Sequence, residues 1–298
     1  MPKPPNVFEG GGLAEGEGRF AVKSTLDTDE LLKTVEAVEQ QEAREVLGND
    51  FFGPPEIQKV FGVTLEKIPP IPFTREELEK AKELGQQLIL FTDVVVDEGA
   101  QLPATINNLF SMYPSVWDGN RMGVRMKDVS ADFRAKETPR MGWRLVSKKV
   151  IPRTEDATYI GSLRVLANYF GELDAGRTEE SWYQSIWEEV NREGVDIEDA
   201  MAIEEDWRSS LESITRLRAS QCFGERAVEC VYRLIVNQEL HDTRLLSDTY
   251  VHTTSIFPDQ GLVRVGFFRE EGMALSITSP LENYPQVGMC FSRGAAPK

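Results

Sequence analysis

The chain has 298 residues, 41% of them hydrophobic, which is enough to bury a core and excludes a wholly disordered protein. Its 49 Asp and Glu residues outnumber 33 Lys and Arg residues, and the resulting formal net charge of −16 argues against nucleic acid as a partner. Three cysteines and two histidines, with no CxxC spacing, predict free thiols and exclude a disulfide framework or a zinc site.

The N-terminal segment, residues 1–25, is rich in Pro, Gly and Glu and predicts a disordered tail. It lacks the apolar centre of a signal peptide, and no stretch of the chain approaches the roughly 18 apolar residues of a membrane span. Its glycine run EGGGLAEGEG has neither a preceding strand nor a lysine, so no phosphate-binding loop and no cofactor are predicted. The sequence therefore predicts a soluble protein without membrane insertion, and it leaves the compartment open.

Residues 26–84 predict an N-terminal helical extension. The first helix is expected from Asp27 to Gly48, where glycine provides the cap. A short helix follows in FFGPPEIQKVFGV, and a third begins at a capping box formed by Thr74 and Glu77.

The following segment mixes strand and helix patterns. LILFTDVVV is apolar at most positions, which is typical of a strand buried on both faces, and MGWRLVSKKVIP predicts a second strand. A short helix around Ile106 and Leu109 is expected to end at Pro114. The basic side chains of residues 121–140 could contact an acidic partner, but pairing with the chain's own carboxylates explains them more simply.

The second half predicts helices first and strands last. The helices are expected at residues 156–170, 177–192, 195–219 and 224–240, and the third has the clearest spacing of apolar residues. After Thr243 four short strands are expected, in DTYVHTTSIF, LVRVGFF, MALSIT and VGMCFSR. Their closeness favours antiparallel pairing, and the chain as a whole predicts an α+β fold with small antiparallel sheets.

No catalytic set is visible in the sequence. The acidic pairs Asp97–Glu98, Glu204–Glu205 and Glu270–Glu271 are adjacent residues, whereas a hydrolytic pair must converge across a cleft. His241 beside Asp242 is expected to serve the end of a helix, since a relay would need a nucleophile held by geometry.

Three C-terminal stretches together resemble the variable proteins of diversity-generating retroelements. They are GWRLVSKKVIP, LLSDTYVHTTS and LVRVGFFREEGMALSITSPLENYPQVGMCFSR, and the resemblance spans about residues 85–295. The residues that carry the closing pattern are Val263, Val265, Gly266, Phe268, Gly272, Pro280, Gly288, Phe291, Ser292 and Arg293. The chain departs from the pattern at His252, where an aromatic residue is expected, and at Thr278, where tryptophan is expected.

The resemblance implies a C-type-lectin-like domain of the formylglycine-generating-enzyme type over residues 85–298. A helical insertion would occupy about residues 156–240, and the candidate variable region would be residues 261–293. Such a fold would close by pairing LILFTD with GMCFSR. The implied function is non-enzymatic display of a hypervariable face toward an unidentified ligand, a protein or cell-surface molecule, without calcium.

The mutagenesis of this family gives a codon criterion for the variable residues. Adenine-directed change of an AAC or AAT codon keeps a pyrimidine in the third place, which excludes Glu270, Glu271, Met273, Glu282 and Gln286. The remaining candidates for ligand binding are Arg264, Phe267, Arg269, Ala274, Ser276, Thr278, Ser279, Leu281, Asn283 and Tyr284.

Two other functions stay open at this point. A formylglycine-generating-type enzyme would need a reactive cysteine, and Cys290 lies within the last strand pattern. Alternatively, the chain is a structural or interaction scaffold with a fixed C-terminal segment, in which the helices after residue 156 bind the partner.

Overall fold

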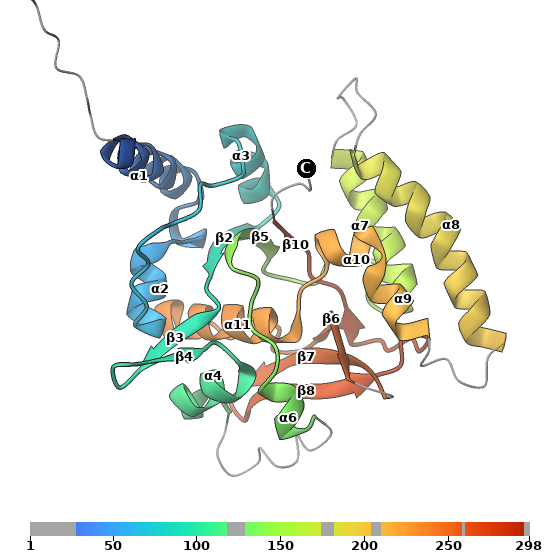
Figure 1. The fold of residues 1–298 in the computed structure, drawn as a ribbon. Coiled ribbons are helices and arrows are strands. Elements are labelled where there is room, and N and C mark those ends of the chain that lie inside the picture. Colours follow the sequence, from blue (N-terminus) through green and yellow to red (C-terminus); the bar gives the residue numbers. More distant parts are fainter. Residues whose placement is uncertain (1–27, 118–128, 174–181, 204–209, 258–259, 295–298) are drawn as a thin grey trace, which may run out of the picture.

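The fold was analysed in a computed structural model that describes residues 28–117, 129–173, 182–203, 210–257 and 260–294 (Figure 1). The expected tail at residues 1–25 lies outside this part of the chain. The described residues form an α+β structure with two four-stranded sheets and one separate hairpin, as the mixture of strand and helix patterns predicts.

The first sheet joins distant parts of the chain in the order β1-β2-β5-β10. Its strands are β1 (Phe51–Phe52), β2 (Gln86–Phe91), β5 (Gly142–Ser147) and β10 (Ser292–Arg293). β1 runs parallel to β2, and the other two pairs are antiparallel. Residues 26–84 therefore contribute a strand to this sheet in addition to helices.

The expected pairing of LILFTD with GMCFSR is wrong, because β5 lies between these segments. β5 pairs with β2 along its whole length, from Gln86 opposite Ser147 to Phe91 opposite Gly142. This pairing occupies the free edge of β2, so β10 adds to the other side of β5 at Ser292 and Val146.

LILFTDVVV forms two strands rather than one. The first is β2, and the second is β3 (Val94–Asp97), which makes a hairpin with β4 (Ala100–Pro103). The turn residues Glu98 and Gly99 both have positive φ, of 47° and 84°, as a tight hairpin turn requires. The backbone leaves the first sheet at Asp93, and the apolar pattern of LILFTDVVV does not predict this break between two strands.

The second sheet has the order β8-β7-β6-β9. Its strands are β6 (Tyr250–Phe257), β7 (Gly261–Arg269), β8 (Gly272–Thr278) and β9 (Val287–Gly288). The antiparallel pairing of β6 with β7 and of β7 with β8 is confirmed.

The last expected strand, VGMCFSR, is divided between the two sheets as β9 and β10. β9 runs parallel to β6, which corrects the expectation of antiparallel pairing throughout. Two parallel neighbours must be joined by a long connection. β6 and β9 are joined by residues 258–286, which include β7 and β8, and this connection is long enough for parallel pairing.

Helix α11 (Ala227–His241) lies between the two sheets and contacts β2, β6 and β7 (Figure 1). All its side chains from Ala227 to Asn237 are buried, as expected for a helix enclosed on every side. They include Glu229 and Arg233, and each of these charges faces a partner of opposite sign. The core of the molecule is therefore built around a helix that we expected within an insertion.

The other helices surround these layers. In the first half they are α1 (Thr28–Leu47), α2 (Pro54–Phe61), α3 (Arg75–Glu83), α4 (Ile106–Met112) and α6 (Ala131–Arg134), with short 3-10 turns at Gly48–Asp50 and Pro114–Trp117. The glycine cap at Gly48, with φ of 60°, and the capping box of Thr74 and Glu77 are both confirmed.

The helical region of the second half differs from its prediction in one place. Its remaining helices are α7 (Tyr159–Leu173), α8 (Trp182–Ile203), α9 (Leu211–Arg216) and α10 (Arg218–Phe223), and α7 packs on α8 at the side of the molecule (Figure 1). The expectation of one helix at residues 195–219 is wrong, because α8 supplies its start and the chain turns out of helical geometry at Leu217, with ψ of 135°. Apolar spacing continues across that break, which is why the sequence concealed it.

Candidate functional site

Four of the candidate binding residues come together on the second sheet, in a group that we call the arginine–tyrosine cluster. Its members are Tyr250, Arg264, Phe267, Arg269 and Tyr284. The Arg264 guanidinium lies 4.6 Å from the centre of the Tyr250 ring and 4.9 Å from that of Tyr284. Such contacts between a cation and ring faces are attractive and hold the arginine in place.

A β-bulge positions the second half of the cluster. The register of β7 and β8 shifts between Gly266 and Arg269, and Phe267 has a positive φ of 46°. This irregularity turns the Phe267 ring toward Tyr250, with the ring centres 4.5 Å apart, and places Arg269 4.9 Å above Phe267. Arg269 is also paired with Asp248, its Nη2 lying 3.0 Å from Oδ1. Bulges commonly redirect side chains in this way.

The structure separates the ten candidates by exposure. Arg269 and Asn283 are exposed, and Arg264, Phe267, Ser276, Ser279, Leu281 and Tyr284 are half-buried. Ala274 and Thr278 are each only 2% exposed, so the structure removes them from a binding surface. The codon criterion selects residue types that adenine-directed mutagenesis can produce and takes no account of burial, so it admitted Ala274 and Thr278.

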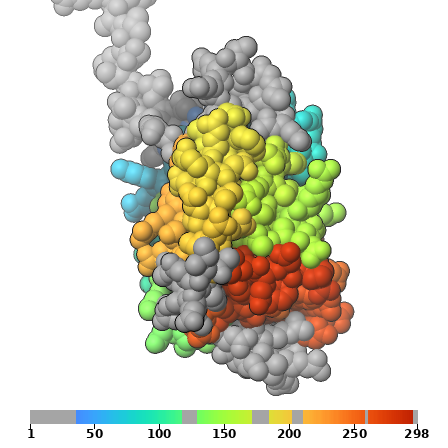
Figure 2. Space-filling view, turned by 90° about the vertical axis from the view of Figure 1, so that its right-hand side faces the viewer, coloured from blue at the N-terminus to red at the C-terminus, as the bar shows by residue number. Residues whose placement is uncertain are grey.

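Leu281 is partly buried and packs against the hydrophobic core, so it also differs from a displayed residue. Among the positions that the codon criterion excluded, Met273 is buried, whereas Glu270, Glu282 and Gln286 are exposed. Figure 2 shows the C-terminal part of the chain, in red, as a continuous surface beside α7 and α8. The accessible cluster residues belong to this part of the chain.

His252 is paired with Arg264 in the register of β6 and β7, so the two side chains project from the same face of the sheet. It is 2% exposed, and neither ring nitrogen has a hydrogen-bond partner among the described residues. Burial, with a smaller contribution from the charge of Arg264, lowers the pKa of His252 to about 4. The His252 ring meets the Tyr159 ring edge to face, with 5.7 Å between the ring centres, so His252 packs as a buried aromatic side chain.

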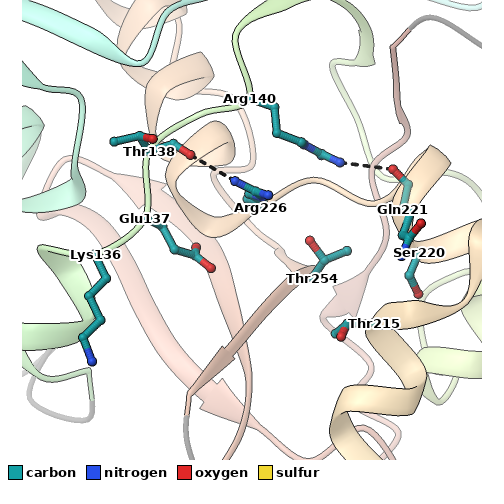
Figure 3. Close-up of a pocket in the computed structure, with 9 residues that line it drawn as sticks. All are labelled: Lys136, Glu137, Thr138, Arg140, Thr215, Ser220, Gln221, Arg226 and Thr254. Atoms are coloured by element: carbon teal, nitrogen blue, oxygen red, sulfur yellow. Dashed lines mark hydrogen bonds between the residues drawn. The ribbon is translucent and has the colours of Figure 1, made fainter. Parts of the chain in front are cut away.

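A second feature was missed by the sequence analysis, a polar cleft of about 690 Å³ (Figure 3). It lies among the segment before β5, helices α9 and α10, the start of α11, and β6. Its lining residues are Lys136, Glu137, Thr138, Arg140, Thr215, Ser220, Gln221, Arg226 and Thr254.

One wall of the polar cleft is fixed by Arg140. Its Nε and Nη2 donate to the two carboxylate oxygens of Glu229 at 2.8 and 2.7 Å. Nη2 also donates to the backbone carbonyl of Gly224, and Nη1 donates to that of Gln221. Glu229 further accepts from the backbone N–H of Arg226 at 2.9 Å. Four of the five guanidinium N–H groups of Arg140 are therefore engaged within the protein, and they link the segment before β5 to α10 and α11.

The remaining charges of the polar cleft are less engaged. Arg226 donates from Nη1 to the carbonyl of Thr138 at 3.3 Å, and neither Arg226 nor Lys136 forms an ion pair with any described residue. Glu137 accepts a short hydrogen bond from Ser255, and burial raises its pKa. The basic segment 121–140 was the sequence signal for this site: pairing with the chain's own carboxylates is confirmed for Arg140 and not seen for Lys136. Residues 121–128 lie outside the described chain.

The three thiols are poorly suited to nucleophilic chemistry. Cys230 and Cys290 are buried, and Cys222 is half-buried. Burial raises the pKa of all three, for Cys290 to about 11. A reactive cysteine needs partial exposure and a lowered pKa, so the geometry gives no support to the formylglycine-generating alternative.

The three acidic pairs and the His241–Asp242 pair lie at turns, at the end of a helix or outside the described residues. Asp242 ends α11 in the left-handed conformation, with φ of 50°, which confirms the helix-end role. Asp97 and Glu98 lie at the β3–β4 turn, Glu270 and Glu271 lie at the β7–β8 turn, and Glu204–Glu205 is not described.

Within the described ranges, no group of three or more His, Cys, Asp or Glu side chains is placed to hold a metal ion. None of the helices in those ranges has the length and apolarity needed to cross a membrane. Comparison of the chain with protein-family models, curated proteins and solved structures gives no significant match.

Proposed function

We propose that this protein is a non-enzymatic ligand-binding protein that uses the arginine–tyrosine cluster as its binding surface. The observation that carries the proposal is the arrangement of Arg264 between two tyrosine rings, continued by Arg269 above Phe267. Arginine and aromatic residues dominate the binding energy of protein interfaces. Tyrosine buries a large area with only two rotatable bonds, and the arginine guanidinium offers several N–H donors and stacks on aromatic rings.

The cluster has the properties of a surface that can change without loss of the fold. Four of its residues belong to β6 and β7, whose backbone hydrogen bonds do not depend on the side chains, and Tyr284 lies in the connection between β8 and β9. Valine side chains on the opposite face of β7, at Val263 and Val265, are fully buried and anchor the sheet. Arg264 forms no ion pair with a described residue, whereas Arg269 is paired with Asp248, so Arg264 gives the surface a positive charge that favours an acidic group on the ligand.

We further propose that the C-terminal part is a C-type-lectin-like domain diversified in the manner of retroelement variable proteins. Two features support this proposal. An early strand, β2, and the last strand, β10, belong to one sheet, although β5 separates them. A second sheet follows the helices, and its strand β7 carries Arg264, Phe267 and Arg269, which are candidate variable residues of the arginine–tyrosine cluster.

A library tests the binding function. Six positions would be randomised with codons ending in a pyrimidine: Arg264, Phe267, Arg269, Ser276, Asn283 and Tyr284. A control library would randomise buried positions of the same strands: Leu262, Val263, Val265, Phe268, Ala274 and Leu275. Resistance to trypsin on the surface of yeast measures folding, and selection against one purified acidic protein, such as ovalbumin, measures binding.

We expect most members of the first library to remain folded and some to bind the target, and most members of the control library to unfold. Equal loss of folding in both libraries would contradict a display surface. Diversification is tested separately by sequencing the neighbouring DNA. A reverse transcriptase and a near-copy of the segment encoding residues 261–293, differing at adenines, would support it, and their absence would contradict it.

A further inference from the structure

We propose that the polar cleft binds a small metabolite that carries a phosphate or carboxylate group together with hydroxyl groups. This inference concerns a site apart from the arginine–tyrosine cluster and does not depend on the proposed function. It is built on Arg226, Lys136 and Glu137 and on the hydroxyl groups beside them (Figure 3).

The dimensions of the polar cleft suit a small molecule. Its volume of about 690 Å³ falls within the range of roughly 300–1,000 Å³ that is usual for small-molecule sites. None of the described lining residues has a large apolar side chain, so burial of apolar ligand surface is not what would drive binding. The lining instead offers hydrogen-bonding and charged groups, which select a polar ligand.

The charge of the polar cleft favours an anion. Arg140 is paired with Glu229, whereas Arg226 and Lys136 form no ion pair with a described carboxylate, although Arg226 is near enough to Glu137 for the two charges to attract. Among the lining residues that the structure describes, Glu137 is the one acidic residue that opposes them. The described lining residues therefore carry a net positive charge, whereas the chain as a whole has a net charge of −16. Arginine binds phosphate and carboxylate groups with paired N–H donors, and it would be the principal contact.

Arg226 is held in position by two hydrogen bonds, one from its backbone and one from its side chain. Its backbone N–H is held by Glu229 at 2.9 Å, and its Nη1 is held by the carbonyl of Thr138 at 3.3 Å. The other guanidinium N–H groups have no partner among the described residues and can donate to a ligand. This preorganisation lowers the entropy lost on binding.

The other side of the polar cleft offers acceptors. Glu137 uses Oε2 to accept from Ser255, and Oε1 has no partner in the described structure. The Thr254 hydroxyl donates to the carbonyl of Glu225 and the Thr215 hydroxyl donates to that of Glu212, so each keeps lone pairs that can accept. Hydroxyl groups on the ligand would supply the matching donors.

Isothermal titration calorimetry of the full chain with four probes tests the inference. The probes are inorganic phosphate, glucose 6-phosphate, gluconate and glucose. We expect glucose 6-phosphate or gluconate to bind more tightly than inorganic phosphate, because they reach both sides of the polar cleft. Glucose is expected to bind most weakly, because it lacks the anionic group. A phosphopeptide can be added as a fifth probe, and tighter binding of the peptide than of every small molecule would overturn the small-ligand proposal.

Variants identify the site. Arg226→Gln is expected to weaken the best probe about tenfold or more, since a hydrogen bond to a charged group is lost, and Lys136→Gln is expected to weaken it less. Arg226→Lys keeps the charge and should retain part of the affinity. Arg192→Gln on α8 removes the same charge from an exposed site and should leave affinity unchanged.

Circular dichroism would confirm that Arg226→Gln is folded, and Arg226→Lys serves if it is not. Absence of saturable binding for all probes overturns the inference. So does equal weakening by Arg226→Gln and Arg192→Gln, which would show general attraction between charges. Equal binding of phosphate and glucose 6-phosphate contradicts the role of Glu137 and the hydroxyl groups. A Tyr284→Ala variant should bind the probes normally, which separates this site from the arginine–tyrosine cluster.

Discussion

The charged residues of α11 show how single side chains connect the core to the polar cleft. Burial opposes ionisation of Glu229, but the hydrogen bonds and charge of Arg140 outweigh this effect and hold the pKa of Glu229 at about 2. An unfolded glutamate has a pKa of about 4.3. Because folding lowers the pKa, the pair stabilises the protein above about pH 4.3, and the benefit is lost as pH falls toward the folded value.

We predict that Glu229→Gln lowers the free energy of unfolding at pH 7 by about 3 kcal/mol, because Arg140 loses its counter-charge in a largely buried site. The difference from the unchanged protein should shrink between about pH 4.3 and pH 2, where Glu229 becomes protonated in both states. Urea unfolding at several pH values measures it. Glu239→Gln, at the exposed end of the same helix, is the control and should have little effect. A difference that stays constant with pH would contradict the assigned pKa.

These residues also show what the sequence could and could not predict. The apolar residues of α11 predict a helix near residues 224–240, and that is confirmed. Glu229 and Arg233 look in the sequence like a solvated face, because their partners are not defined by local spacing. Arg140 lies 89 residues away from Glu229, and the pairing depends on the packing of both sheets. The polar cleft depends on that same packing, so the basic segment 121–140 indicated one wall of it but not the residues from α9, α10, α11 and β6 that complete it.

At the level of the elements, Gly266 controls the bulge that aims Phe267 into the arginine–tyrosine cluster. A Cβ atom at Gly266 would lie 2.1 Å from the backbone oxygen of Thr249 and 2.7 Å from the Cα of Tyr250. Both obstacles are backbone atoms, which cannot move aside as the end of a flexible side chain could. This position therefore requires glycine.

We predict that Gly266→Ala destabilises the protein by about 3 kcal/mol or more, because the close contact forces β6 and β7 apart. Gly99→Ala is the control, since Gly99 has a positive φ of 84° but no atom within 4 Å of the new Cβ. Its cost should be roughly 1–2 kcal/mol, from backbone strain alone. Thermal and urea unfolding compare the two. Equal effects would show that strain, and not the contact with Thr249, determines the requirement.

The elements that the sequence predicted well are those defined by local patterns. The capping box at Thr74, the short helix after the proline pair and the β6–β7–β8 meander follow from residue spacing and turns. The errors in the strands occur where one apolar run serves two sheets, at Asp93 and between β9 and β10, and the error in the helices occurs at the break at Leu217. Alternation with a period of two residues predicts that a segment is a strand, but it does not predict which sheet the strand joins.

At the level of the whole molecule, the segment after Gln286 joins the two sheets. β9 pairs with β6 and β10 pairs with β5, while Met289 and Phe291 are buried between them. The Phe291 ring lies 4.0 Å from that of Phe170 on α7, centre to centre. The helices, both sheets and the arginine–tyrosine cluster thus depend on one C-terminal connection.

We predict that truncation after Gln286 abolishes cooperative folding. Loss of the Phe291 side chain alone would cost about 3–5 kcal/mol, and total stabilities are only about 5–15 kcal/mol. The truncation also removes a strand from each sheet and leaves unpaired backbone groups of β5 and β6. Truncation after Gly294 is the matched control, because it retains every described strand. Circular dichroism and thermal unfolding should show no transition for the shorter chain and an unchanged midpoint for the control. A cooperative transition of the shorter chain near that of the full chain would mean that the sheets are stable without this connection, and the arginine–tyrosine cluster would then not depend on it.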